Sequence, residues 1–181
     1  MTRTLGIPDF ITHYSRGEPF RSLSDVPNGE LDRVLQELNE ANAWGLPRFS
    51  DPEYLPRRVR VEQRLRAEFI DKGGIPTLEH PIYFFLGRNP QFEEHERNKS
   101  YSVRLKDIPK NAISFTYGDS MFSLDEDYRK LKGEGYLSEL CPHVYTIEEL
   151  PALFAHHDLL ADTGLHIEAQ VWIIPSGKNQ K

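Results

Sequence analysis

The clearest pattern in the chain is an alternation of apolar and polar residues between positions 165 and 174, which predicts a β-strand. Successive side chains of a strand point to opposite faces of its sheet. One face of this strand would carry an apolar stripe suited to a core, formed by Ile167, Ala169, Val171 and Ile173. The other face would carry three polar side chains and one aromatic ring, from His166, Glu168, Gln170 and Trp172. This second face is either half solvated or the floor of a functional site.

Apolar patterning predicts the remaining elements as well. Alternation and short apolar runs predict strands at 10–14, 82–86, 101–105 and 113–117, and Val144-Tyr145 adds a strand residue or two. Apolar residues at helical spacing predict helices at 30–43 and 56–72. Thr146 with Glu149 three residues later is the capping-box pattern that opens a third helix. Segment 118–135 is polar and interrupted by glycines, so we expect a functional or mobile loop there.

The order of these elements predicts an α+β fold. Its sheet would be mixed and largely antiparallel, with helices inserted after the first strand and before the last. Segment 82–86 is apolar throughout, so we expect that strand to be buried on both faces and central in the sheet. No glycine-rich phosphate loop follows any of the predicted strands. The chain has 181 residues, which suits a single domain covering 1–181.

Composition narrows the functional classes. The net charge of -6 argues against broad, non-specific binding of nucleic acid. The only cysteine, Cys141, cannot form an internal disulfide, and we expect it to be a buried or inert thiol. We find no apolar run long enough for a signal peptide or a membrane helix, so we expect a cytoplasmic protein without membrane partners.

His166 and Glu168 are the first candidates for catalysis. They lie two residues apart on one face of the predicted strand, so their Cβ atoms are about 7 Å apart and could share a ligand or a water. Glu168 could serve as a general base or as an anchor for a sugar hydroxyl, and burial beside Trp172 would raise its pKa. A small-molecule hydrolase built on this pair is one interpretation. An ordinary solvated strand face is the other.

His13 and Tyr83 are candidates for ligand binding. His13 ends a β-like segment near Arg16 and Arg21, and could donate to the hydroxyls or phosphates of a ligand. A structural histidine, hydrogen-bonded near the strand end, would fit the same pattern. Tyr83 could stack on a planar ligand ring, or simply belong to the core.

The predicted helix at 56–72 is rich in arginine. Arg57, Arg60 and Arg64 fall on one face and could dock nucleic acid or an acidic protein. The same helix could instead be a surface of internal salt bridges, with Arg64 paired to Glu68 and Glu62 to Arg66. We expect no metal site, because the histidines lack the spacing of known metal motifs.

Several short motifs resemble known families. The segments THY, PIYFFLG, ISFTYGDS and EAQVW resemble a group of uncharacterised bacterial proteins of about this length. More distantly, the order of ITHY, PIYFF and HIEAQVW is similar to the ADP-ribosyltransferase fold, in particular its His-Tyr-Glu branch and the related DNA-targeting toxins. The segment SVRLKDIPKNAISFTYGD also resembles a strand–loop–strand unit of those toxins.

The second resemblance implies an NAD-dependent ADP-ribosyltransferase with NAD as its substrate. His13 would bind the adenine-side ribose, and Tyr83 would stack on nicotinamide. Glu168 would hold the hydroxyl of the nicotinamide ribose and stabilise the positively charged transition state. Arg88 would correspond to the toxins' arginine. The rival hypothesis is a non-catalytic module that binds through the arginine-rich helix.

Overall fold

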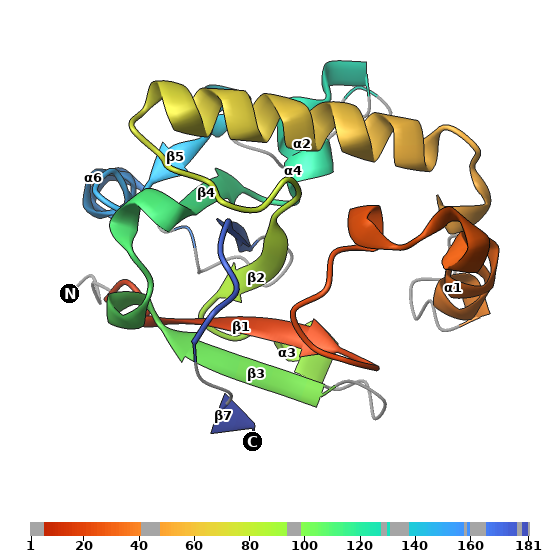
Figure 1. Ribbon diagram of the computed structural model, residues 1–181. Coiled ribbons are helices and arrows are strands. Elements are labelled where there is room, and N and C mark those ends of the chain that lie inside the picture. The colour runs from red at the N-terminus through yellow and green to blue at the C-terminus, as the bar shows by residue number, and fades with distance from the viewer. Residues whose placement is uncertain are drawn as a thin grey trace.

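The computed structural model describes residues 6–40, 48–93, 99–127, 130, 138–157, 159, 166–176 and 179–180. The strands within these ranges form one seven-stranded sheet (Figure 1). They are β1 (Phe10–Ser15), β2 (Ile82–Leu86), β3 (Lys99–Arg104), β4 (Ile113–Tyr117), β5 (Tyr145–Thr146), β6 (Ile167–Val171) and β7 (Asn179–Gln180). The strand order is β5-β4-β6-β2-β1-β3-β7, and every neighbouring pair is antiparallel. The predicted α+β class with a largely antiparallel sheet is therefore confirmed.

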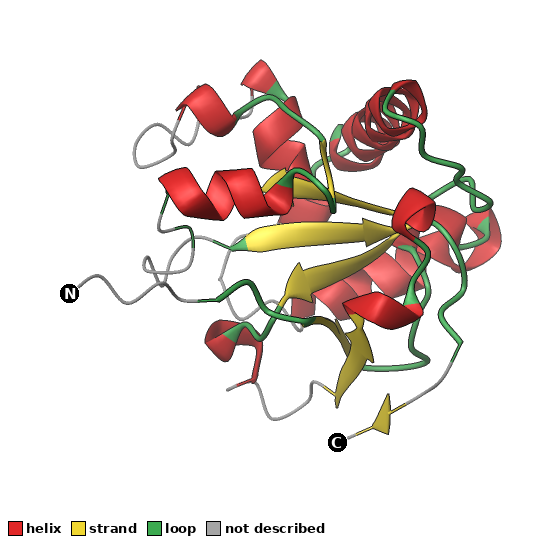
Figure 2. Cartoon of the chain, turned by 90° about the vertical axis from the view of Figure 1, so that its left-hand side faces the viewer, coloured by secondary structure: helices red, strands yellow, loops and turns green. Residues whose placement is uncertain are grey.

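Helices and short 3-10 turns connect the strands. The helices are α1 (Asn28–Glu40), α2 (Tyr54–Asp71), α3 (Pro90–Glu93), α4 (Ser120–Leu124) and α6 (Leu150–His156). The 3-10 turns are η1 (Leu23–Asp25), η2 (Arg48–Ser50), η3 (Leu105–Asp107), η4 (Lys110–Ala112) and η5 (Ser138–Leu140). The long helix α2 runs across one side of the sheet with α4 beneath it, and α6 lies near β5 (Figures 1 and 2).

The three strands that carry the candidate ligand-binding motifs are neighbours. β6, β2 and β1 lie side by side at the centre of the sheet, although residues 16–81 separate β1 from β2 and residues 87–166 separate β2 from β6 along the chain. The prediction that segment 82–86 would be a central strand is confirmed, with the predicted bounds. Its burial alternates, however, because Tyr83 and Phe85 on one face stay partly exposed while Ile82, Phe84 and Leu86 on the other are buried.

The two faces of the sheet differ in chemistry because cross-strand neighbours share a face. One face is an apolar core that includes Ile11, Phe84, Phe115, Ala169 and Val171. The register places a more polar set on the opposite face, formed by Tyr83, Phe85, Ser114, Thr116, Glu168 and Gln170. Helices α2 and α4 cover this polar face through a second apolar cluster around Trp172.

Helix α2 forms because its apolar residues recur at helical spacing. Val61, Leu65 and Phe69 are buried against Trp172, and the Phe69 and Trp172 rings stack with centroids 6.2 Å apart. The helix ends at Asp71, and Gly73 then adopts a φ of 90°, a left-handed conformation that suits glycine. A Cβ on Gly74 would lie 2.4 Å from the Phe69 ring, so only glycine fits there.

Two expectations about local structure are corrected. The segment after β4 does not begin as a loop: α4 spans Ser120–Leu124, and all five of its residues are buried. Residues 128–129 and 131–137 of the expected loop lie outside the described residues. The second face of the last strand is not half solvated either, because Gln170 and Trp172 are each 0% exposed beneath α2 and α4. Both corrections have one cause, the packing of these helices on the polar face.

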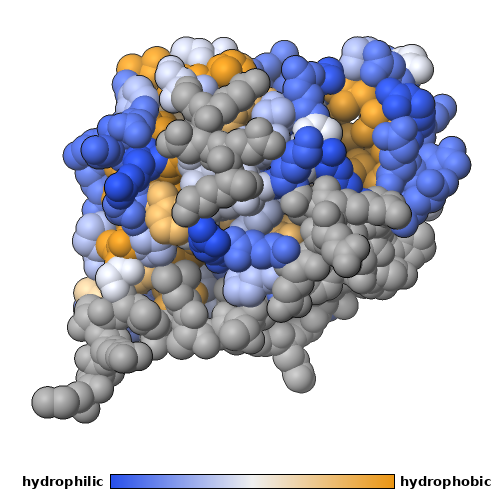
Figure 3. All heavy atoms as spheres, turned by 90° about the horizontal axis from the view of Figure 1, so that it is seen from below, coloured by the Kyte–Doolittle hydropathy of each residue, from blue (hydrophilic) through white to orange (hydrophobic). Residues whose placement is uncertain are grey.

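Helices α6 and α1 differ in how firmly they are held. Before α6, the main-chain N–H of Thr146 donates to the Glu149 carboxylate at 2.7 Å, which is one half of the predicted capping box. Thr146 does not open the helix, however, because it belongs to β5 and the N-cap of α6 is Glu149. Helix α1 has no buried residues, and its strongest packing is against η2. Figure 3 shows hydrophobic residues in a hollow ringed by hydrophilic ones, on the side of the molecule where α1 lies.

Candidate functional site

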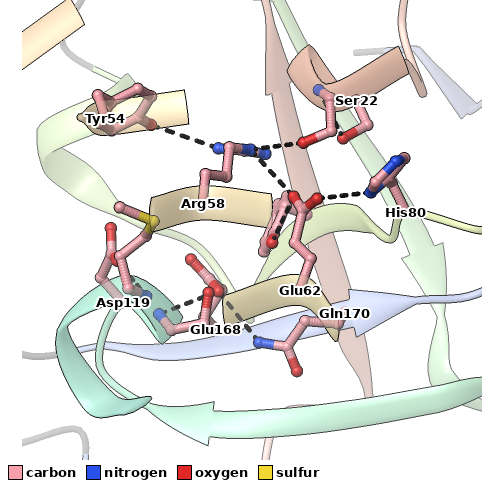
Figure 4. A network of polar contacts seen from close by, with 12 residues as sticks. Ser22, Tyr54, Arg58, Glu62, His80, Asp119, Glu168 and Gln170 are labelled. Atoms are coloured by element: carbon pink, nitrogen blue, oxygen red, sulfur yellow. Dashed lines mark hydrogen bonds and ion pairs between the residues drawn. The ribbon is translucent and has the colours of Figure 1, made fainter. Parts of the chain in front are cut away.

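Glu168 lies on the central strand β6, where the polar face of the sheet meets the start of α4 (Figure 4). Its Oε1 atom accepts the main-chain N–H of Ser120 at 3.2 Å and the side-chain N–H of Gln170 at 3.0 Å. The neighbouring Asp119 caps α4 by accepting the N–H groups of Met121 and Phe122. The turn at the start of α4 therefore supplies N–H donors to two carboxylates.

The environment of Glu168 favours its neutral form. Burial raises the pKa of Glu168 to about 8, and the nearby Asp119 carboxylate adds to the rise. The hydrogen bonds from Ser120 and Gln170 oppose it, because they stabilise the charged form. Glu168 therefore carries a proton at neutral pH and exchanges it just above pH 7, a range suited to acid–base chemistry.

His166 lies two residues before Glu168, on the same face, and is partly exposed. Its ring meets Phe85 edge-on, with centroids 4.7 Å apart. Burial lowers the pKa of His166, although the Asp119 carboxylate opposes the change. The imidazole is consequently neutral at pH 7 and able to accept a proton. Because Phe85 pairs with Glu168 across the sheet, the His166 ring lies on the same face as Glu168.

Tyr83 belongs to a buried polar network with α2. Its hydroxyl donates to Oε1 of Glu62 at 2.9 Å, and the Arg58 guanidinium lies 4.7 Å from the centre of its ring. Arg58 also pairs with Glu62 at 2.9 Å, and the second Glu62 oxygen accepts from Nδ1 of His80 at 2.7 Å (Figure 4). Burial raises the pKa of Tyr83 well above its ordinary value, with Glu62 and Glu168 adding to the rise and Arg58 opposing it. Tyr83 therefore stays protonated.

Glu62 is the member of this site that the sequence did not reveal. Only 1% of its side chain is exposed, and it takes Arg58, one turn earlier, as its ion-pair partner in place of the expected Arg66. Arg66 instead donates to the carbonyl of Pro76. The signal available in the sequence was the Arg58–Glu62 spacing of four residues, next to the inward-facing apolar stripe.

His13 does not share the site. Thr12 pairs with Phe85 and points to the polar face, so the His13 ring points to the apolar face, where it contacts Phe20 and Phe84. Its Nδ1 donates to the carbonyl of Tyr83 at 2.8 Å, and its Nε2 accepts the main-chain N–H of Phe20 at 3.2 Å. Of the three positions that the resemblance assigns to NAD, Tyr83 and Glu168 therefore lie on one face of neighbouring strands, and His13 lies on the other face. The His13 imidazole fixes the main chain behind Tyr83.

Three of the four remaining arginine candidates pair with acidic side chains of the same chain. Arg88, 51% exposed, pairs with Glu93 at 3.2 Å. Arg57 pairs with Asp125 at 3.2 Å, and Arg64 pairs with Glu68 at 2.6 Å, the second as the helical spacing predicted. Arg60 is exposed on the surface of α2.

Among the residues that the structure describes, no group of three histidine, cysteine or acidic side chains is placed to hold a metal ion. Within the same residues, no helix is both long and apolar enough to cross a membrane. No family model, curated protein or solved structure matches this chain.

Proposed function

We propose that the chain is an ADP-ribosyltransferase-like domain that takes NAD as its substrate, with Glu168 as the central catalytic residue. The observation that carries the proposal is the placement of Tyr83 and Glu168 on one face of adjacent central strands. An aromatic ring and a carboxyl are the two groups needed to hold a planar base and the sugar attached to it. The sequence resemblance assigns these two positions the same roles.

In the proposed reaction, the bond between C1′ of the ribose and the nicotinamide nitrogen breaks, and its electron pair leaves with nicotinamide. The positive charge of the pyridinium passes to the ribose, and the Glu168 carboxylate stabilises it. An acceptor then attacks C1′ and loses a proton. His166, which is neutral and lies beside Glu168, takes up that proton.

The protonation of Glu168 makes this reaction pH-dependent. Only the carboxylate form can stabilise a cationic ribose, and a pKa of about 8 leaves Glu168 mostly neutral at pH 7. Turnover should therefore rise between about pH 7 and pH 9. The positive charge on the nicotinamide ring of bound NAD favours the carboxylate and shifts this rise to lower pH.

The surroundings of Tyr83 suit a planar cation. The ring already holds the Arg58 guanidinium, which is flat, delocalised and positively charged. Nicotinamide in NAD has the same three properties. A nicotinamide ring stacked on Tyr83 would compete with Arg58 for this ring or occupy its other side.

Titration of the protein with NAD by calorimetry tests the proposal. Wild type should bind NAD and release nicotinamide. Glu168→Gln should retain binding within about tenfold and lose about 10²–10³ of the turnover, the usual effect of removing an electrostatic stabiliser. Tyr83→Leu should weaken binding because the stacking ring is gone. Glu30→Gln, the same change at an exposed position on α1, is the matched control and should behave as wild type.

Absence of NAD binding by the wild-type protein would overturn the proposal. Equal turnover by Glu168→Gln and wild type would remove Glu168 from the mechanism. The rival binding module has less support, because Arg57 already pairs with Asp125 and Arg64 with Glu68.

A further inference from the structure

A chain of hydrogen bonds leads from Trp172 to Glu168 inside the protein. Nε1 of Trp172 lies 3.0 Å from Oγ of Ser114, which lies 3.0 Å from Oε1 of Gln170. Nε2 of Gln170 lies 3.0 Å from Oε1 of Glu168. Trp172, Ser114 and Gln170 are each 0% exposed, so water does not compete for these bonds. The chain lies on the polar face of β4 and β6, beneath α2 and α4.

The chemistry of the end groups fixes the direction of this chain. The indole N–H of Trp172 can only donate, so Ser114 must accept from it. Ser114 keeps its hydroxyl proton, which it donates to the carbonyl oxygen of Gln170. A reversed amide would leave that buried proton without an acceptor. The amino end of Gln170 therefore faces Glu168.

A second contact fixes the same orientation independently. The hydroxyl of Thr116 donates to the carbonyl of Gly118 at 3.1 Å, because that carbonyl can only accept. Thr116 Oγ1 consequently accepts from Nε2 of Gln170 at 3.0 Å. The two N–H bonds of Gln170 thus go to Thr116 and Glu168. Reversal of the amide is opposed by two locks: Ser114, oriented by Trp172, would lose the acceptor of its proton, and Thr116, oriented by Gly118, would lose its donor.

We infer that Trp172 and Thr116 are positioning residues, which hold the Gln170 amide so that it always donates to Oε1 of Glu168. Ser120 N–H donates to that same oxygen. With both donors on Oε1, the exchangeable proton and the ligand-facing role fall to Oε2. The part of this inference that concerns catalysis by Glu168 rests on the proposed function. The orientation of the Gln170 amide does not depend on the proposed function.

The orientation decides which form of Glu168 is favoured. An N–H donor stabilises the carboxylate, whereas a carbonyl oxygen in its place would stabilise the protonated acid through an O–H···O bond. A reversed Gln170 would therefore withdraw one of the groups that oppose the effect of burial. Glu168 would then ionise at still higher pH.

The test is an NMR titration of the Glu168 carboxyl carbon in Trp172→Phe, Thr116→Val and the double variant. Each single variant leaves one lock in place and should change the ionisation midpoint little. The double variant frees the amide, and its midpoint should rise by about one pH unit, a tenfold change in the ionisation constant. Phe69→Leu is the control, because it disturbs the ring stacked on Trp172 without touching a polar atom. Its midpoint should match wild type.

A measurement on the wild-type protein covers the case in which the double variant does not fold. The side-chain amide protons of Gln170 should show nuclear Overhauser contacts to Thr116. Contacts to Ser114 in their place would overturn the inference, as would a folded double variant that titrates like wild type. Neither measurement contains NAD, so failure of NAD binding would refute the proposed function and leave this inference standing.

Discussion

Replacing Glu168 with glutamine should stabilise the protein, and the gain should grow with pH. Glutamine has the same shape, and its carbonyl can accept the N–H groups of Ser120 and Gln170 in place of Oε1. It carries no charge at any pH. The comparison therefore isolates the free energy of ionising one carboxyl inside the folded protein.

The magnitude follows from the pKa of Glu168, which is about 8 in the folded protein against the ordinary value of 4.5. Between these values the folded protein holds a proton that the unfolded chain has lost, so the free energy of unfolding of wild type falls as the pH rises. Below pH 4.5 both states are protonated, and above pH 8 both are ionised. The wild-type penalty at pH 9 is at most about 5 kcal/mol, and less to the extent that water reaches the partly exposed carboxyl.

Urea unfolding of both proteins, followed by tryptophan fluorescence, measures the difference. The two should be nearly equal in stability at pH 4.5, and Glu168→Gln should lead by several kcal/mol at pH 9. Glu30→Gln, on the exposed surface of α1, should show no such trend. The description of Glu168 as a buried acid would be refuted if the difference in free energy of unfolding between the two proteins stayed constant from pH 5 to pH 9. It would also be refuted if wild type became the more stable of the two as the pH rose.

Three further predictions concern stability. Gly74→Ala should cost about 1–3 kcal/mol, since the new Cβ would overlap the Phe69 ring, and urea unfolding would measure it. Glu62→Leu should cost about 3–5 kcal/mol by leaving the Arg58 cation buried without its carboxylate, and an unchanged unfolding midpoint would contradict the network. Wild type should lose stability as the pH falls below 6.5, because burial lowers the pKa of the His13 imidazole in the folded protein. The melting temperature of His13→Asn should depend less on pH than that of wild type. An equal dependence in the two proteins would contradict this prediction.

The strands were predictable because their signals are local. Segments 82–86 and 113–117 match β2 and β4 residue for residue, since a short apolar run in the first and an alternation in the second, each next to turn residues, are enough to define a strand. The contact between the Thr146 N–H and the Glu149 carboxylate is also local, since it joins residues three apart in the chain. Each of these features needs no information from elsewhere in the chain.

The polar face of the sheet was not predictable because it is built from distant segments. Gln170 and Trp172 read as half solvated in their own strand, and their burial comes from α2, about 100 residues earlier. Helix α4 has only five residues, too few for a helical period to stand out, although Asp119 is a good capping residue. Glu62 was missed for the reason that acidic side chains are almost always on the surface unless paired.

For the candidate site, residue type and strand assignment were predictable but direction was not. Tyr83 and Glu168 were placed on strands, and both strands exist. Which face each side chain takes depends on register, and a shift of one residue reverses it. The register sends His13 to the opposite face from Tyr83, and no local pattern could have indicated that.

The position of β6 in the sheet has a consequence for synthesis of the protein on the ribosome. Its five residues fill the gap between β4 and β2, yet they are translated after both. Until β6 leaves the ribosome, the facing edges of β4 and β2 have no partner strand, and unpaired strand edges promote aggregation. The sheet is therefore completed late, through pairings that are remote along the chain, and we expect slow folding and a need for chaperones while the ribosome is still at work.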